Sequence, residues 1–145
     1  MNLFTIGFTG KSAEKFFDLL ENSKATKLID IRINRTSQLA GFAKEQDLKY
    51  FLPKLASMDY LVREDLAPTK ELLASYRNKE LSWDLFSQNY RKLLENRGAV
   101  HSLSIPEIEN SVLLCSESDP EKCHRTILAN LLFQLHPTIK VTNLM

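Results

Sequence analysis

The fold of this chain is decided near its start by Leu3-Phe4-Thr5-Ile6-Gly7-Phe8, followed directly by Thr9-Gly10-Lys11-Ser12. A short apolar run with a β-branched centre is typical of a buried strand, and the glycine after it is typical of a turn. Ser12 is a favourable N-cap, and Glu14 suits the positive end of a helix. The stretch therefore predicts a strand, a turn and a helix in succession.

The same alternation continues to the end of the chain. Further strands are predicted at Lys27–Ile33, Asp59–Arg63, Ser111–Cys115 and Ile139–Leu144. Further helices are predicted to start at Asp47, at Pro68-Thr69, near Trp83 and at Asp119-Pro120-Glu121. Strands that alternate with helices predict an α/β fold with a mostly parallel central sheet and helices on both faces. Because the sequence has no repeat and no linker, we expect a single α/β domain over residues 1–145.

The composition is that of an ordinary globular protein, with 43% hydrophobic and 26% charged residues. No stretch approaches the roughly 20 apolar residues of a membrane helix, and no basic leader precedes an apolar run. Two cysteines do not make a disulfide framework. We therefore expect a cytoplasmic protein with no membrane partner. The net charge of +1 does not decide for or against a polyanionic partner.

The segment from Leu113 to Arg125 carries the densest chemistry of the chain. Cys115 ends a predicted buried strand, where backbone N–H groups and cations can lower the pKa of a thiol. Cys123 is predicted in the first turn of a helix, His124 can relay a proton near neutral pH, and Glu117 offers a second proton-transfer group. Arg125 can supply positive charge to the thiol and bind an anion in bidentate fashion.

Structural explanations of these residues remain open. Cys115 can be a small buried hydrophobic residue, Cys123 and His124 ordinary first-turn residues, and Arg125 an ion-pair partner of Glu121. Nine residues separate Cys115 from Arg125, which is longer than the loop of a cysteine phosphatase. Seven residues separate the two cysteines, which is longer than structural zinc sites use. We therefore expect no metal ion and no cofactor.

Other cations could also contribute to a ligand site. Lys11 lies in a Gly-Lys-Ser turn like the end of a phosphate-binding loop, but Thr5 occupies the position of its leading glycine. The turn can still bind an anion at the helix N-terminus, and the alternative is a plain strand-to-helix turn. Arg32 shares a strand face with Asp30 and either binds an anion or forms a structural ion pair.

The motifs together resemble one known family. They are Thr5-Ile6-Gly7, Ser12-x-Glu14-x-Phe16, Asp30-x-Arg32 with Ser37 and Gly41-Phe42, Leu66-x-Pro68, Leu114-Cys115-x-Glu117, and Cys123-His124-Arg125. This pattern resembles the family catalogued as domain of unknown function 488 over nearly the whole chain. The resemblance implies a compact bacterial or archaeal α/β protein of uncharacterised activity. It also implies that six residues match signature positions of the family: Arg32, Cys115, Glu117, Cys123, His124 and Arg125.

Two hypotheses follow, and the sequence leaves open whether the protein is an enzyme. In the first, an enzyme acts on an anionic small molecule, such as a nucleotide or sugar phosphate, at the carboxyl ends of the strands. The residues that bind the ligand are Arg32, Arg125, Lys11 and Cys123. Cys115 is a nucleophile or an oriented thiol, and Glu117 or His124 moves protons. In the second, the chain is a module that binds nucleic acid or protein, and its cysteine–histidine–arginine segment is structural. Nucleic acid is possible but not favoured, and the sequence does not predict an oligomeric state.

Overall fold

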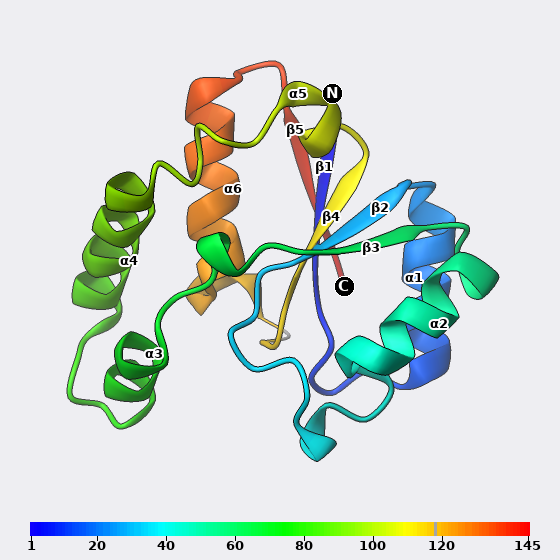
Figure 1. Cartoon of the computed structure of the whole chain (residues 1–145), viewed down its shortest axis with the longest axis horizontal. Coiled ribbons are helices and arrows are strands. Elements are labelled where there is room, and N and C mark those ends of the chain that lie inside the picture. Colours follow the sequence, from blue (N-terminus) through cyan, green and yellow to red (C-terminus); the bar gives the residue numbers. More distant parts are fainter. Residues whose placement is uncertain (118) are drawn as a thin grey trace.

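A computed structural model describes residues 1–117 and 119–145 of the chain, with the side chains of residues 38 and 39 left out. Within the described residues one sheet has five strands in the order β3-β2-β4-β1-β5. Every strand pair in it is parallel (Figure 1). The strands are β1 (Asn2–Gly7), β2 (Lys27–Asp30), β3 (Asp59–Val62), β4 (Ser111–Cys115) and β5 (Lys140–Leu144).

Helices cover both faces of this sheet, which confirms the predicted architecture (Figure 1). The helices α1 (Ala13–Ser23) and α2 (Glu45–Leu55) pack on one face. The helices α3 (Lys70–Arg77), α4 (Trp83–Arg97) and α6 (His124–Leu135) pack on the other. A short helix, α5 (Ile105–Ile108), precedes β4. No helix in the part of the chain that the structure describes is both long and apolar enough to span a membrane.

Helix starts follow local cap chemistry, which the sequence signals well. The hydroxyl of Ser12 accepts a hydrogen bond from the backbone N–H of Lys15, and Thr69 and Ser82 cap α3 and α4 in the same way. Each of these hydroxyls satisfies one of the N–H groups that a helix leaves free in its first turn. At the other end of α4, Gly98 takes a left-handed conformation at φ 62° and stops the helix.

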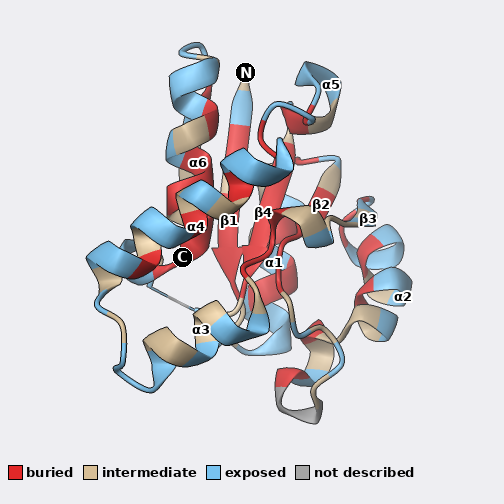
Figure 2. Cartoon of the chain, turned by 60° about the vertical axis from the view of Figure 1, so that its left-hand side comes forward, coloured by how far each residue is buried: buried red, intermediate tan, exposed pale blue. Residues whose placement is uncertain are grey.

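The core consists of two apolar layers, one on each face of the sheet. Alternate residues of a strand point to opposite faces, so Leu113 packs toward α4 and α6 whereas Val112 and Leu114 pack toward α1 and α2. Strand β4 is buried along its whole length because it lies in the middle of the sheet (Figure 2). Cys115 ends this central strand on the same face as Leu113, toward α6.

The topology brings the ends of two central strands together at one edge of the sheet. Strands β1 and β4 are neighbours, and their last residues, Gly7 and Cys115, are in register. The chain leaves β1 toward α1 on one face, and it leaves β4 toward α6 on the opposite face. Loops that diverge in this way open a crevice at the carboxyl ends of the strands, where ligands of open parallel sheets bind.

Three differences from the predicted element bounds affect the interpretation of the site. Strand β2 ends at Asp30 instead of Ile33, because the next residues turn away to let Arg32 pair with Asp30. Helix α2 begins at Glu45, so Asp47 lies in its first turn and does not cap it.

The third correction concerns the start of the last helix. Asp119 caps only a 3₁₀ turn, Pro120–Lys122, and α6 begins afterwards at His124. Cys123 is therefore the N-cap of α6, with extended backbone angles, rather than a first-turn residue. Ser118, within the segment highlighted above, lies outside the described residues.

Candidate functional site

A pocket of about 380 Å³ lies at the carboxyl edge of the sheet, in the predicted location. Its wall is formed by residues that follow β1, β2 and β4 together with residues of α3, α4 and the start of α6. Those used below are Arg32, Tyr76, Arg77, Trp83, Phe86, Cys115, Glu117, Lys122, Cys123 and His124. The pocket volume is in the range that holds small-molecule ligands.

Cys115 stands at the base of this pocket with its thiol held by neighbours on several sides. Its Sγ lies 2.8 Å from Sγ of Cys123 and 3.3 Å from Nδ1 of His124. Burial, the largest influence, raises the pKa of Cys115. The hydrogen bond from Cys123, the backbone N–H groups of Ser116 and Glu117, and the charge of Arg125 together outweigh it and leave the pKa below the ordinary value. The arrangement therefore makes Cys115 easier to ionise than an ordinary thiol.

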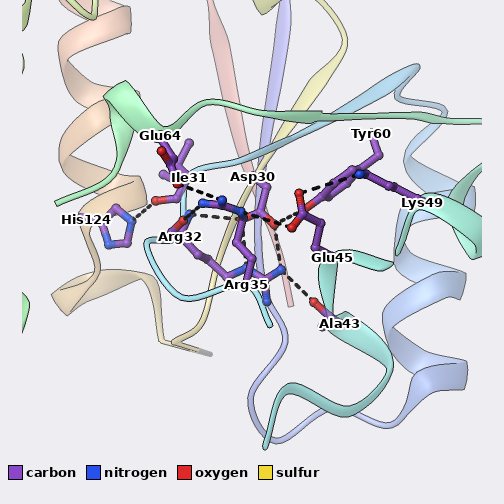
Figure 3. Close-up of polar contacts among 10 residues, drawn as sticks. All are labelled: Asp30, Ile31, Arg32, Arg35, Ala43, Glu45, Lys49, Tyr60, Glu64 and His124. Atoms are coloured by element: carbon purple, nitrogen blue, oxygen red, sulfur yellow. Dashed lines mark hydrogen bonds and ion pairs between the residues drawn. The ribbon is translucent and has the colours of Figure 1, made fainter. Parts of the chain in front are cut away.

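His124 is the first residue of α6, and its ring joins this thiol to the chain after β2. Its Nε2 lies 2.9 Å from the carbonyl oxygen of Ile31 (Figure 3). A carbonyl can only accept, so Nε2 carries the proton and donates it. Burial lowers the pKa of His124, which favours the neutral ring. Nδ1 of that neutral ring is then an unprotonated base directed at Cys115.

Cys123 differs from Cys115 in protonation although both side chains are 2% exposed. The hydrogen bond that its thiol donates to Cys115 favours the protonated form, and burial adds to this effect. The pKa of Cys123 is therefore well above that of an ordinary thiol. The two cysteines form an asymmetric pair in which Cys115 accepts and Cys123 donates.

Arg125 is fully buried beneath the pocket, and its donors are used by the protein. The guanidinium donates to the carbonyl of Glu117, to Oγ1 of Thr5 at 3.3 Å and to Sγ of Cys123 at 3.5 Å. These contacts connect β1, the loop after β4 and α6. Arg125 therefore holds the loop that follows Cys115 and adds positive charge near the thiols. Its predicted direct contact with a ligand stays a prediction.

Arg32 belongs to a buried ion pair and also lines the pocket. Its Nε and NH2 donate to the two carboxylate oxygens of Asp30 at 2.9 and 2.7 Å, and NH2 also donates to the carbonyl of Ala43 (Figure 3). Asp30 further accepts from the hydroxyl of Tyr60 at 2.5 Å. NH1 is buried and has no hydrogen-bond partner within the described residues. The structural interpretation of Arg32 is supported because the ion pair with Asp30 is formed. Its predicted contact with an anion stays a prediction, for which the NH1 group is an available donor.

The rim of the pocket adds charges and rings that the sequence did not single out for this site. Arg77, at the end of α3, lies 3.9 Å from the carboxylate of Glu117, and both side chains are about half exposed. Lys122 brings a further cation to the wall. Tyr76, Trp83 and Phe86 line the same side, and the Trp83 and Phe86 rings are stacked 5.4 Å apart. Sequence spacing assigned these rings to helix faces, and only the packing of α3 and α4 directs them to one pocket.

Lys11 lies away from the thiols. Its Nζ donates to the carbonyl of Gly7 at 2.8 Å, and the side chain lines a different pocket with Thr9, Gly10 and Lys15. Burial, followed by the charges of Arg125 and Lys15, lowers the pKa of Lys11. Lys11 therefore helps to close the turn after β1, and its predicted contact with a ligand stays a prediction.

Cys115, Cys123 and His124 are residues that can bind metal, and their ligand atoms all lie within 4.8 Å of one another. Two thiolates on one tetrahedral zinc ion are about 3.8 Å apart, because each Zn–S bond is about 2.3 Å. The sulfurs here are 2.8 Å apart and hydrogen-bonded to each other. The geometry therefore fits a thiol pair better than a zinc centre, and the expected absence of a metal stays a prediction.

Comparison with known proteins gives one match. The family model described as "Domain of unknown function DUF488" matches residues 12–132. This range includes Arg32, Cys115, Glu117, Cys123, His124 and Arg125, whereas β1 and Lys11 precede it. Neither the curated proteins nor the solved structures give a significant match to the chain.

Proposed function

The chain belongs to the DUF488 family, whose description names no activity, and we propose that it is an enzyme that uses Cys115 as a nucleophile. Its substrate is a small anionic molecule bound in the pocket above the thiol. We further propose that it works in the cytoplasm, where its two free cysteines stay reduced.

The observation that carries this proposal is the contact between Cys115 and His124 at the base of a ligand-sized pocket. A nucleophile next to a base, with the base oriented by a third group, is the general arrangement for covalent catalysis. Here the thiol is 3.3 Å from Nδ1, and the carbonyl of Ile31 orients the ring through Nε2. The proton that leaves the Cys115 thiol thus has an acceptor within reach.

The surroundings favour an anion over a neutral or cationic substrate. Arg32, Arg77 and Lys122 line the pocket, and Glu117 is the acid among the residues described above. The NH1 group of Arg32 is a buried donor without a partner in the described part of the chain, and such a group is costly until it finds an acceptor. A phosphate, sulfonate or carboxylate oxygen would satisfy it.

In the proposed reaction, Cys115 forms a bond to the electrophilic atom of the substrate. The electron pair of the broken bond goes to the leaving group. His124, which has taken the thiol proton on Nδ1, returns it to that group. Cys123 stabilises the thiolate before attack through its hydrogen bond.

A binding module remains the competing proposal, and one observation favours it. The guanidinium of Arg125 donates hydrogen bonds to Thr5, to Cys123 and to the carbonyl of Glu117. This part of the family signature therefore stabilises the folded structure. If the same were true of Cys115 and His124, the pocket would bind a partner without chemistry.

Alkylation of the native protein distinguishes the two proposals. Iodoacetamide labelling is followed by mass spectrometry across pH, and each cysteine is measured separately. We expect Cys115 to react fast near neutral pH and below the pH at which a free thiol ionises, whereas Cys123 reacts slowly. Cys123 is the internal control because its side chain is equally buried. If Cys115 stays unlabelled until the protein unfolds, the nucleophile is excluded.

A further inference from the structure

We propose that Cys115 and Cys123 form a two-electron dithiol couple, and that the substrate is the disulfide of a small anionic thiol. This inference rests on the proposed function because it uses Cys115 as the attacking group. It goes further by naming the reaction, reduction of a disulfide, and by giving Cys123 the role of resolving thiol.

The first argument is the distance between the two sulfurs. They lie 2.8 Å apart, whereas a disulfide bond is about 2.05 Å long, so a shift of less than about 1 Å joins them. Both cysteines are free and both line the pocket. A substrate sulfur bound to Cys115 is therefore within the immediate reach of Cys123.

The second argument is the way in which the two thiols are supported. Cys115 ends a buried central strand, so its position is fixed by the sheet. Cys123 lies at the junction between a 3₁₀ turn and α6, where its backbone is extended. The resolving thiol therefore stands on a segment that has no ladder hydrogen bonds to break when it approaches Cys115.

The third argument is that a base lies close enough to accept the thiol protons of Cys115 and Cys123. Thiol–disulfide exchange is fastest when the attacking group is a thiolate and the resolving group can be deprotonated in turn. Nδ1 of His124 lies 3.3 Å from Sγ of Cys115, and the ligand atoms of His124 and both cysteines all lie within 4.8 Å of one another. One base therefore serves both steps.

One reduction of the substrate balances with the two thiols of the protein. Cys115 gives its proton to Nδ1 of His124, and the thiolate attacks one sulfur of the substrate disulfide. The substrate S–S bond breaks, a mixed disulfide forms, and one thiol leaves with the proton that His124 returns. Cys123 loses its proton to His124 and attacks the sulfur of Cys115. The mixed disulfide breaks, the second thiol leaves with that proton, and a Cys115–Cys123 bond remains. The substrate gains two electrons, the protein loses two, and an external dithiol reductant restores the thiols.

The charge of the pocket selects the substrate among disulfides. Arg32 and Arg77 line the pocket next to the carboxylates of Asp30 and Glu117, and Lys122 adds a further positive charge to the wall. Acidic groups on the two halves of the disulfide are therefore attracted and basic groups are repelled. Two commercial compounds make a matched pair for this comparison. Dithiodipropionate carries two carboxylates, and cystamine carries two ammonium groups at similar distances from the same S–S bond.

The test follows the reduced full-length protein, freed of reductant under argon, after addition of each compound at neutral pH. With dithiodipropionate we expect loss of two hydrogens from the intact protein, a Cys115–Cys123 linkage in the non-reducing peptide map, and two molecules of released mercaptopropionate. Cystamine should react at least about tenfold more slowly, since charge focusing in a cleft changes encounter rates by this order or more. Arg77→Gln should reduce the difference, whereas Lys92→Gln on the exposed side of α4 makes the same charge change and should preserve it.

Variants separate the two steps. Cys123→Ser should stop at a mixed disulfide on Cys115, and Cys123→Ala serves the same purpose if the serine variant unfolds. Cys115→Ser should not react. If wild-type protein stops at the mixed disulfide, or if its cysteines never join, the dithiol couple is refuted while the nucleophile survives. If neither cysteine reacts in native protein, both proposals fail. Equal rates with the two compounds would refute the anionic substrate.

Discussion

The guanidinium of Arg125 lies next to Gly7, where its Nη1 donates a hydrogen bond to the carbonyl of Glu117. A Cβ on Gly7 would lie 2.7 Å from NH1 of Arg125, and it would also overlap the carbonyl of Glu117. The loop after β4 therefore crosses directly over the end of β1. Only a residue without a side chain allows this close approach. This crossing fixes the backbone N–H groups that face Cys115.

Gly7→Ala is expected to destabilise the fold by about 1–3 kcal/mol, because a backbone carbonyl in a packed loop has little room to move. The displaced loop should also slow the alkylation of Cys115. The measurement is urea unfolding together with the labelling rate. Gly10→Ala is the matched control: no heavy atom lies within 4 Å of its Cβ position, but its φ of 79° opposes a side chain. The control should cost about 1 kcal/mol and leave Cys115 unchanged, so an equal effect of both variants on labelling would contradict this account.

Asp30→Asn is expected to lower the free energy of unfolding by about 3–5 kcal/mol, because it leaves the Arg32 guanidinium buried without its counter-charge. Tyr60→Phe is the matched variant, since it removes one hydrogen bond to the same carboxylate and keeps the ion pair. It should cost about 1–3 kcal/mol. Unfolding in urea measures both. If Asp30→Asn costs no more than Tyr60→Phe, the ion pair does not hold the loop that forms the pocket wall.

The sheet and its helices could be predicted because their signals are local. The apolar run of β4 matches Ser111–Cys115 residue for residue, and Ser12 caps α1 as expected. The predicted start of α6 was wrong because two segments next to each other can each begin a helical turn. Asp119 and Pro120 are typical of a helix start, but they only form a 3₁₀ turn before His124.

The chemistry of the site could be predicted only in part, because its contacts join distant segments. Cys115 and His124 stand out in the sequence, but the role of His124 depends on Ile31, which is 93 residues away. Arg77 carries no sequence signal, since nothing local distinguishes it from other cations at a helix end. Nothing in the sequence separates Arg125 from Arg32, and both are buried. Their contacts differ, because Arg125 donates to the loop after β4 whereas Arg32 lines the pocket.

Generic duplex DNA is expected to bind weakly or not at all at physiological salt. Binding to a phosphate backbone normally needs several clustered cations, and the net charge of the chain is only +1. Fluorescence anisotropy with a labelled duplex, repeated over a salt series, measures this. Tight binding that falls steeply with salt would instead favour the binding module over the enzyme.

The buried ring of His124 predicts a loss of stability in acid. Burial lowers the pKa of His124 below its ordinary value of 6.5. As the pH falls below 6.5, His124 binds a proton in the unfolded chain but stays neutral in the folded protein. The unfolded state is therefore favoured. The free energy of unfolding should therefore decrease in this range, by at most about 1.4 kcal/mol per pH unit for one proton. Above pH 6.5, His124 should no longer make the free energy of unfolding depend on pH.

His124→Gln tests this origin of the slope and the proposed proton transfer together. A glutamine amide can replace Nε2 as the donor to the carbonyl of Ile31, but it offers no base to Cys115. Urea unfolding from pH 4.5 to pH 8 should show a shallower acid slope for this variant than for the wild type. Alkylation of Cys115 at neutral pH should also become slower. The same substitution at exposed His101 supplies the control for loss of one histidine. If wild type and His124→Gln lose stability in parallel, His124 is not the neutral, buried ring on which the proposed chemistry depends.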